Sequence, residues 1–297
     1  MIPNGYNTIP NALFLQAIAA AVGSVGTTYY VDCNSGNDAN DGSSWENAYK
    51  TLAPAIAASH ARIAADSTGW ASRNRIFIKG DSFAENLTAF PQKTDIIGVG
   101  SCDFIPKAKI IGYHKPATAV MGCRWFNVAF QYFGAKPIVD LITGNHGAAF
   151  VGCDFIGDST TTKCILSTNN ADIRIEGCQL YGNGTTIPAI GVDIAGTTHN
   201  VNAKIIGNFI HAAVGIAVAA NGKTSGGLIA DNYIRATGLA IDENSDLMLV
   251  VNNRWVSSAG NGSADTCDLE LANCVGNILT TANGTCYAYP GITNPTA

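Results

Sequence analysis

Short runs of alternating hydrophobic and polar residues fill the second half of the chain and predict β-strands. Six of these runs align without gaps around one small side chain. They are FVGCDFIG (150–157), IEGCQLYG (175–182), IIGNFIHA (205–212), IADNYIRA (229–236), VVNNRWVS (250–257) and CVGNILTT (274–281). A further strand-like piece precedes most copies, as in AIGVDIAG (189–196). Each repeat therefore predicts two or three short strands joined by turns rich in Gly and Asn.

The aligned position is always Asn or Cys, and successive copies are 25, 30, 24, 21 and 24 residues apart. Its occupants are Cys153, Cys178, Asn208, Asn232, Asn253 and Asn277. Short strands recurring at this period are typical of a β-solenoid, whose equivalent residues stack about 4.8 Å apart. We expect a structural ladder of inward side chains, with ordinary exposed turn residues as the alternative. A weaker seventh copy is predicted at Cys123.

Other solenoids fit the repeat less well. The leucine-rich pattern L-x-x-L-x-L-x-x-N is not matched, because Leu is scarce and β-branched residues dominate the repeats. Left-handed helices of hexapeptide repeats have a different period. The predicted fold class is therefore all-β, a right-handed parallel β-helix with an N-terminal capping helix.

The segment before the repeats changes character twice. TTYYVD (27–32) is rich in β-formers, CNSGNDANDGSS (33–44) is turn-like, and a helical pattern follows. We expect the helix to start with Ser44 as its N-cap or, because of Pro54, to begin anew near Thr51. It would cover the open end of the solenoid, which otherwise exposes its core and unpaired strand edges.

The turn-like stretch does not have the spacing of a calcium-binding EF-hand loop. With Gly42 as the loop glycine, Ala39 and Ala48 occupy positions that need an oxygen ligand. The whole stretch YYVDCNSGNDANDGSSWENAYKTLAPAI (29–56) instead resembles the N-terminal motif of right-handed β-helix proteins of the pectin-lyase-like superfamily. In those proteins a strand, a GNDxNDG turn and a (F/Y)KTLxxAI helix precede the first coil.

With the repeats, this resemblance covers roughly residues 27–285 of the chain. The superfamily includes pectate lyases, polysaccharide hydrolases, phage tailspikes and non-catalytic virion proteins. The resemblance therefore implies an architecture and leaves the chemistry open.

Composition narrows the class of partner. Hydrophobic residues make up 47% of the chain and charged residues only 13%, well below the roughly 25% of ordinary soluble domains. A net charge of −5 gives no basic footprint for nucleic acid. The apolar run at 11–26 has no Lys or Arg before it, unlike a secretory signal, and is too short to span a membrane.

Cysteine and histidine spacing predicts no metal site. The nine cysteines contain no CxxC pair, and the five histidines show no HxH or HExxH spacing. Several cysteines lie within apolar runs, where a free thiol behaves as a small hydrophobic side chain. We expect reduced cysteines and no cofactor.

Acidic residues on the strands ahead of the ladder are the candidate catalytic groups. They are Asp140, Asp193, Asp242, Glu243, Asp268 and Glu270, of which Asp140, Asp193, Asp242 and Glu270 are the predicted catalytic set. Carboxylates one or two coils apart would be about 5 or 10 Å apart, which brackets the separations in retaining and inverting glycosidases. The first three lie 13, 15 and 11 residues before their ladder positions. These unequal separations do not decide whether the three acids share one column of the sheet. The alternative is a set of scattered solvent-facing acids.

Aromatic residues are concentrated in CRWFNVAFQYFG (123–134). Trp125, Phe126 and Tyr132 are candidates for stacking on sugars or for contact with another subunit. The alternative is that these rings pack the core of an irregular early coil.

Four segments follow from these patterns: an anchoring segment (1–26), a first strand with the capping helix (27–74), the β-helix (75–287) and a tail (288–297). We expect a non-enzymatic phage virion protein, made in the host cytoplasm and displayed as a capsid decoration or spike. It would form a homotrimer, contact other virion proteins through residues 1–26 and bind host surface polysaccharide, but neither nucleic acid nor membrane. The alternative function is a tailspike-type polysaccharide depolymerase, and the alternative location is secretion.

Overall fold

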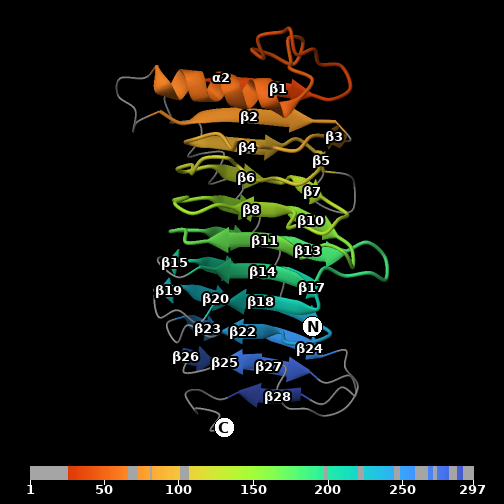
Figure 1. The fold of residues 1–297 in the computed structure, drawn as a ribbon, viewed down its shortest axis with the longest axis vertical. Helices are drawn as coiled ribbons and strands as arrows, with labels where there is room; N and C mark the ends of the chain where they lie inside the picture. Colours follow the sequence, from red (N-terminus) through yellow and green to blue (C-terminus); the bar gives the residue numbers. More distant parts are fainter. Residues whose placement is uncertain are drawn as a thin grey trace, which may run out of the picture.

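The computed structural model shows a parallel β-helix whose coils stack along one long axis (Figure 1). It describes residues 26–65, 72–80, 82–100, 107–196, 200–219, 224–243, 248–257, 267–269, 273–280 and 286–289. The predicted fold class is therefore confirmed. Most of the anchoring segment at 1–26 and most of the tail at 288–297 lie outside the described residues.

Three long sheets run along the solenoid, and each coil contributes one strand to each sheet it visits. The first sheet consists of β1 (Thr28–Asp32), β2 (Asn74–Lys79), β4 (Thr94–Gly98), β6 (Arg124–Phe126), β9 (Ala149–Val151), β12 (Arg174–Glu176), β16 (Lys204–Ile206), β20 (Leu228–Ala230), β23 (Leu249–Val251) and β26 (Asn273–Val275). Neighbouring strands of this sheet come from successive coils and pair in parallel.

The second sheet consists of β3 (Ser82–Ala84), β5 (Lys109–Ile111), β7 (Ala129–Gln131), β10 (Asp154–Gly157), β13 (Gln179–Gly182), β17 (Phe209–Ala212), β21 (Tyr233–Ala236), β24 (Arg254–Ser257), β27 (Asn277–Thr280) and β28 (Cys286–Tyr289). The third sheet consists of β8 (Val139–Leu141), β11 (Lys163–Thr168), β14 (Ile190–Ala195), β18 (Val214–Val218), β22 (Ile241–Glu243) and β25 (Cys267–Leu269). A small separate sheet pairs β15 (Asn200–Val201) with β19 (Thr224–Ser225). The third sheet begins later than the others, so the first coils have loops where later coils have its strands.

The capping helix α2 (Leu52–Ala64) lies across the N-terminal end of the stack, next to β1 and β2 (Figure 1). It begins after Thr51, as expected if Pro54 restarts the helix, and Ser44 is not its N-cap. Carboxylates from elsewhere accept its first free N–H groups: Asp38 binds the Thr51 nitrogen at 2.8 Å, and Glu85 binds the Leu52 nitrogen at 2.8 Å. Negative groups at this end also oppose the positive pole of the helix dipole.

Asp32 organises the turn that follows β1. Its carboxylate accepts hydrogen bonds from the backbone nitrogens of Asn34 and Ser35 and forms an ion pair with Lys79 at 3.1 Å. Burial alone would raise the pKa of Asp32, but these contacts and the Ser35 hydroxyl together lower it to about 2. The Asp32 carboxylate thus has its hydrogen-bond and ion-pair partners within the protein.

A left-handed backbone residue precedes the ladder position in each coil. Gly152, Gly177 and Gly207 have φ values of 61°, 59° and 65°, and Asp231 and Asn252 adopt 55° and 54° at equivalent places. Glycine, Asn and Asp are the residues that tolerate this conformation. This bend joins the first sheet to the second, which explains why the repeats carry Gly, Asp or Asn just before the ladder residue.

The predicted seventh copy was placed in the wrong register. β7 pairs with β10 so that Ala129 lies beside Asp154, which makes Val128 the residue next to Cys153 in the column. Cys123 lies instead ahead of β6 and is fully buried. This coil has the apolar Val128 at the ladder position, so neither Asn nor Cys marks the position in the sequence.

Candidate functional site

An open groove of about 380 Å³ lies where the second sheet meets the start of the third sheet. Loops from three successive coils line it, with two residues from each: Asn86 and Thr88, Tyr113 and Lys115, and Tyr132 and Lys136. These loops follow β3, β5 and β7. The volume is at the low end of the roughly 300–1,000 Å³ of small-molecule sites.

The two tyrosine rings form the aromatic part of the groove. The ring centroids of Tyr113 and Tyr132 are 6.2 Å apart, with an angle of 41° between the ring planes. The ammonium of Lys136 lies 4.8 Å from the centroid of the Tyr113 ring, within the range of a cation–π contact. The side-chain oxygen of Asn86 accepts a hydrogen bond from the Tyr113 backbone nitrogen at 2.9 Å and so fixes the loop.

Asp140 links this groove to the third sheet. Its Oδ2 accepts a hydrogen bond from the Tyr113 hydroxyl at 2.8 Å and forms an ion pair with Lys115 at 2.9 Å. His114 bridges Val139 in parallel register, which places Lys115 directly beside Asp140. Burial first, and then the contact with Asp140, raise the pKa of Tyr113, and the same carboxylate raises the pKa of Lys115. At neutral pH the groove therefore holds a tyrosine hydroxyl and an ammonium group.

The candidate acids Asp140, Asp193 and Asp242 lie in one column of the third sheet. Register places Asp140 and Asp193 on either side of Leu166, and Asp193 and Asp242 on either side of Ala217. Two strand spacings, about 9.6 Å between backbones, separate Asp140 from Asp193 and Asp193 from Asp242, whereas Asp268 of β25 lies on the strand next to Asp242. Glu270, the fourth candidate, lies outside the described residues.

Lysine side chains form ion pairs with the first two acids of this column. Asp193 forms an ion pair with Lys163, as Asp140 does with Lys115. The side chains of Asp140 and Asp193 are only 11% and 12% exposed. Each carboxylate is thus engaged by a neighbouring ammonium, which suits a structural or binding role better than a catalytic one.

The three candidate aromatic residues divide between core and surface. Trp125 is fully buried and packs edge-on against Phe130 at 5.1 Å between ring centroids, and Phe126 is only 7% exposed. Tyr132 is half-buried and reaches the groove. Trp125 points inward from β6, whereas Tyr132 follows the end of β7 and lies in a loop, where strand alternation no longer sets its direction. Trp125 therefore has the position of a core residue, which was the alternative left open for this segment.

The six ladder residues lie in one buried column at the bend between the first and second sheets. The side-chain oxygen of Asn232 accepts hydrogen bonds from the backbone nitrogen of Asn208 at 3.0 Å and from its amide nitrogen at 2.9 Å. The same pattern joins Asn232 to Asn253 and Asn253 to Asn277. The ladder thus satisfies backbone N–H groups that the bend leaves out of the sheets.

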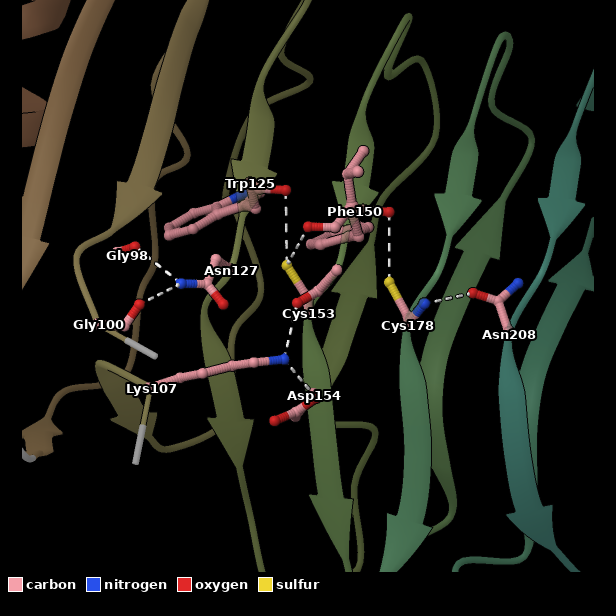
Figure 2. Close-up of polar contacts among 12 residues, drawn as sticks. Gly98, Gly100, Lys107, Trp125, Asn127, Phe150, Cys153, Asp154, Cys178 and Asn208 are labelled. Carbon is pink, nitrogen blue, oxygen red and sulfur yellow. Dashed lines mark hydrogen bonds and ion pairs between the residues drawn. The ribbon is translucent and has the colours of Figure 1, made fainter. Parts of the chain in front are cut away.

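The hydrogen bonds of the ladder differ where Cys replaces Asn (Figure 2). Asn208 still accepts a hydrogen bond from the Cys178 nitrogen at 2.8 Å, but the two thiols point to carbonyl oxygens of the preceding coil, that of Trp125 for Cys153 and that of Phe150 for Cys178. Burial raises the pKa of the Cys178 thiol well above its ordinary value. Both cysteines are therefore buried residues of the core.

Lys107 forms a buried bridge beside this column (Figure 2). Its ammonium donates to the Gly152 carbonyl at 2.8 Å and forms an ion pair with Asp154 at 2.7 Å. The Lys107 side chain is 7% exposed, and its Asp154 partner lies two coils further along the second sheet. This contact joins two coils that are separated by a third, and Lys107 does not line the groove.

Within the described ranges, no three His, Cys, Asp or Glu side chains gather closely enough to hold a metal ion. No helix in the described part of the chain is long and apolar enough to cross a membrane. Comparisons with protein families, with curated proteins and with solved structures found no match for this chain.

Proposed function

We propose that this chain is a non-enzymatic phage virion protein, displayed on the particle surface as a capsid decoration or spike, and that its β-helix binds a host surface glycan. The virion role is supported by the resemblance of residues 29–56 to β-helix proteins of the pectin-lyase-like superfamily, together with the β-helix itself. Secretion is the alternative location.

The groove is the observation that carries the proposed binding. It combines the features of a sugar site: two tyrosine rings for the apolar faces of a sugar, and amide, hydroxyl and ammonium groups for its oxygens. Its residues come from three stacked coils, so rigid strands set their spacing. The ion pairs of Asp140 and Asp193 favour binding over catalysis.

Replacing Tyr132 with alanine should weaken binding to host surface polysaccharide by at least about tenfold, because the variant loses a central aromatic contact. Binding would be measured on immobilised polysaccharide from the host surface. Tyr233→Ala is the matched control, since Tyr233 is 39% exposed on a distant coil and should bind like the wild type. Equal binding by Tyr132→Ala and the wild type, with unchanged thermal midpoints, would contradict a role for this groove.

We also propose that the protein is a homotrimer that contacts other virion proteins through residues 1–26. Parallel β-helices offer three flat faces for such association, and the apolar run at 11–26 is suited to protein contact. Sedimentation should give three times the 30.9 kDa of one chain, and the protein should be detected in purified particles. A monomer absent from particles would rule this proposal out.

The second candidate function is a polysaccharide depolymerase, favoured by the shared column of Asp140, Asp193 and Asp242. Their spacing of about 9.6 Å is close to the upper limit of the separation of roughly 6.5–9.5 Å in inverting glycosidases. This function predicts release of reducing sugar ends from host polysaccharide, lost in Asp193→Asn by at least about a thousandfold. No release by the wild-type protein would exclude it for that polysaccharide.

A further inference from the structure

We infer that the groove selects a sugar that carries a single carboxylate, and that Lys136 is the residue that recognises the acid group. This inference rests on the proposed glycan binding and adds the charge of the ligand. It starts from the distribution of charge among the six lining residues.

The two lysines of the groove are not equivalent. Lys115 is neutralised by Asp140 at 2.9 Å. Lys136 takes part in none of the ion pairs found among the described residues, and its ammonium is held against the Tyr113 ring at 4.8 Å from the centroid. The groove therefore carries one uncompensated positive charge in a chain whose net charge is −5.

This charge is placed where a bound sugar would present a substituent. The Lys136 ammonium contacts the Tyr113 ring, and the Tyr132 ring lies 6.2 Å from that ring, so the Tyr132 ring and the ammonium can engage neighbouring parts of one sugar residue. Asn86 and Thr88 stand on the opposite coil of the groove, where an amide and a hydroxyl can bind sugar hydroxyls. The lining thus divides into a ring platform, one cation and two neutral polar groups.

The same charges limit the ligand to one negative group. Asp140 lies beside the groove, and both Lys115 and Tyr113 contact the same carboxylate oxygen, Oδ2. A doubly charged phosphate ester would face this carboxylate and gain only one free cation, whereas a carboxylate matches Lys136 alone. The overall negative charge is screened within about 8–10 Å at moderate ionic strength, so local attraction by Lys136 decides the preference.

The test compares matched acidic and neutral probes by calorimetric titration of the full chain. One pair is β-1,4-linked hexaglucuronate and cellohexaose, and the other is sialyllactose and lactose. The first pair presents carboxylates along a polymer chain, and the second presents one carboxylate at the end of an oligosaccharide. The two pairs therefore distinguish an internal acidic sugar from a terminal one as the ligand. We expect the acidic member of at least one pair to bind at least about tenfold more tightly than its neutral partner, which corresponds to one charge-assisted contact.

Lys136→Gln should remove this preference by lowering the affinity for the acidic probe to that for its neutral partner. Lys204→Gln is the matched control, because it makes the same charge change on β16 of the first sheet, outside the groove lining. Raising the salt concentration to about 0.5 M should weaken acidic binding by the wild type and not by Lys136→Gln.

Three outcomes would overturn the inference: equal affinity for the acidic and neutral probes, a preference that survives in Lys136→Gln, or no binding of either acidic probe. The proposed function is tested separately, because a protein that binds host polysaccharide through Tyr132 without any preference for acidic sugars would keep that function and lose this inference. Loss of all polysaccharide binding by the wild type would instead remove the proposed function itself.

Discussion

Asn253→Ala is expected to lower the free energy of unfolding by about 3–5 kcal/mol, because it leaves buried donors without partners. The Asn253 side-chain oxygen accepts hydrogen bonds from the Asn232 backbone nitrogen at 3.1 Å and from its amide nitrogen at 2.8 Å. Its own amide nitrogen donates to the Ile229 carbonyl at 2.9 Å and to the Asn277 side chain at 3.0 Å. Alanine makes none of these contacts, and the site is fully buried, so water does not replace them.

The loss should be local as well as large. In a solenoid each coil contacts only its neighbours, so the damage should concentrate in the coils that carry Asn232 and Asn277. Hydrogen exchange should show faster exchange at β21, β24 and β27 than at β6 and β9. Asn183→Ala is the control, since Asn183 is exposed and should change stability by less than about 0.5 kcal/mol. Equal stability of the two variants would contradict the energetic role of the ladder.

The ladder could be predicted from the sequence because it recurs at a fixed place relative to a strand. A Gly, Asp or Asn precedes each ladder residue, and the left-handed bend accounts for that pair of positions. The capping helix was predictable for a similar reason, since Pro54 restricts where it can begin. What the pattern did not reveal is that distant carboxylates, Asp38 and Glu85, supply the caps.

The groove could not be predicted, because no single stretch of sequence contains it. Tyr113, Lys115 and Lys136 lie in loops of unequal length on two different coils, and only Tyr132 belongs to the aromatic segment that drew attention. The acids near the groove could be picked out from the sequence. Their shared column could not, because each acid lies a different number of residues before its ladder position. Loops after the third-sheet strands absorb that difference, so register alone brings Asp140, Asp193 and Asp242 into line.

Phe130→Ala is expected to destabilise the protein by about 3–5 kcal/mol, the usual cost of emptying a buried phenylalanine site. Phe130 is fully buried and packs against rings of its own coil and of the next coil. Its centroid is 5.1 Å from that of Trp125, 5.2 Å from Phe155 and 5.9 Å from Phe150. Close-packed coils on either side cannot collapse into the cavity, because hydrogen bonds of the first and second sheets fix their spacing.

The matched control is Phe133→Ala, three residues further along the same aromatic segment. Phe133 is 44% exposed, so its truncation should change the free energy of unfolding by less than about 0.5 kcal/mol in a denaturant titration. Similar losses in the two variants would mean that Phe130 is not the centre of the core in these coils. The comparison also separates core from groove, since neither variant removes a residue that lines the groove and both should keep their glycan affinity while folded.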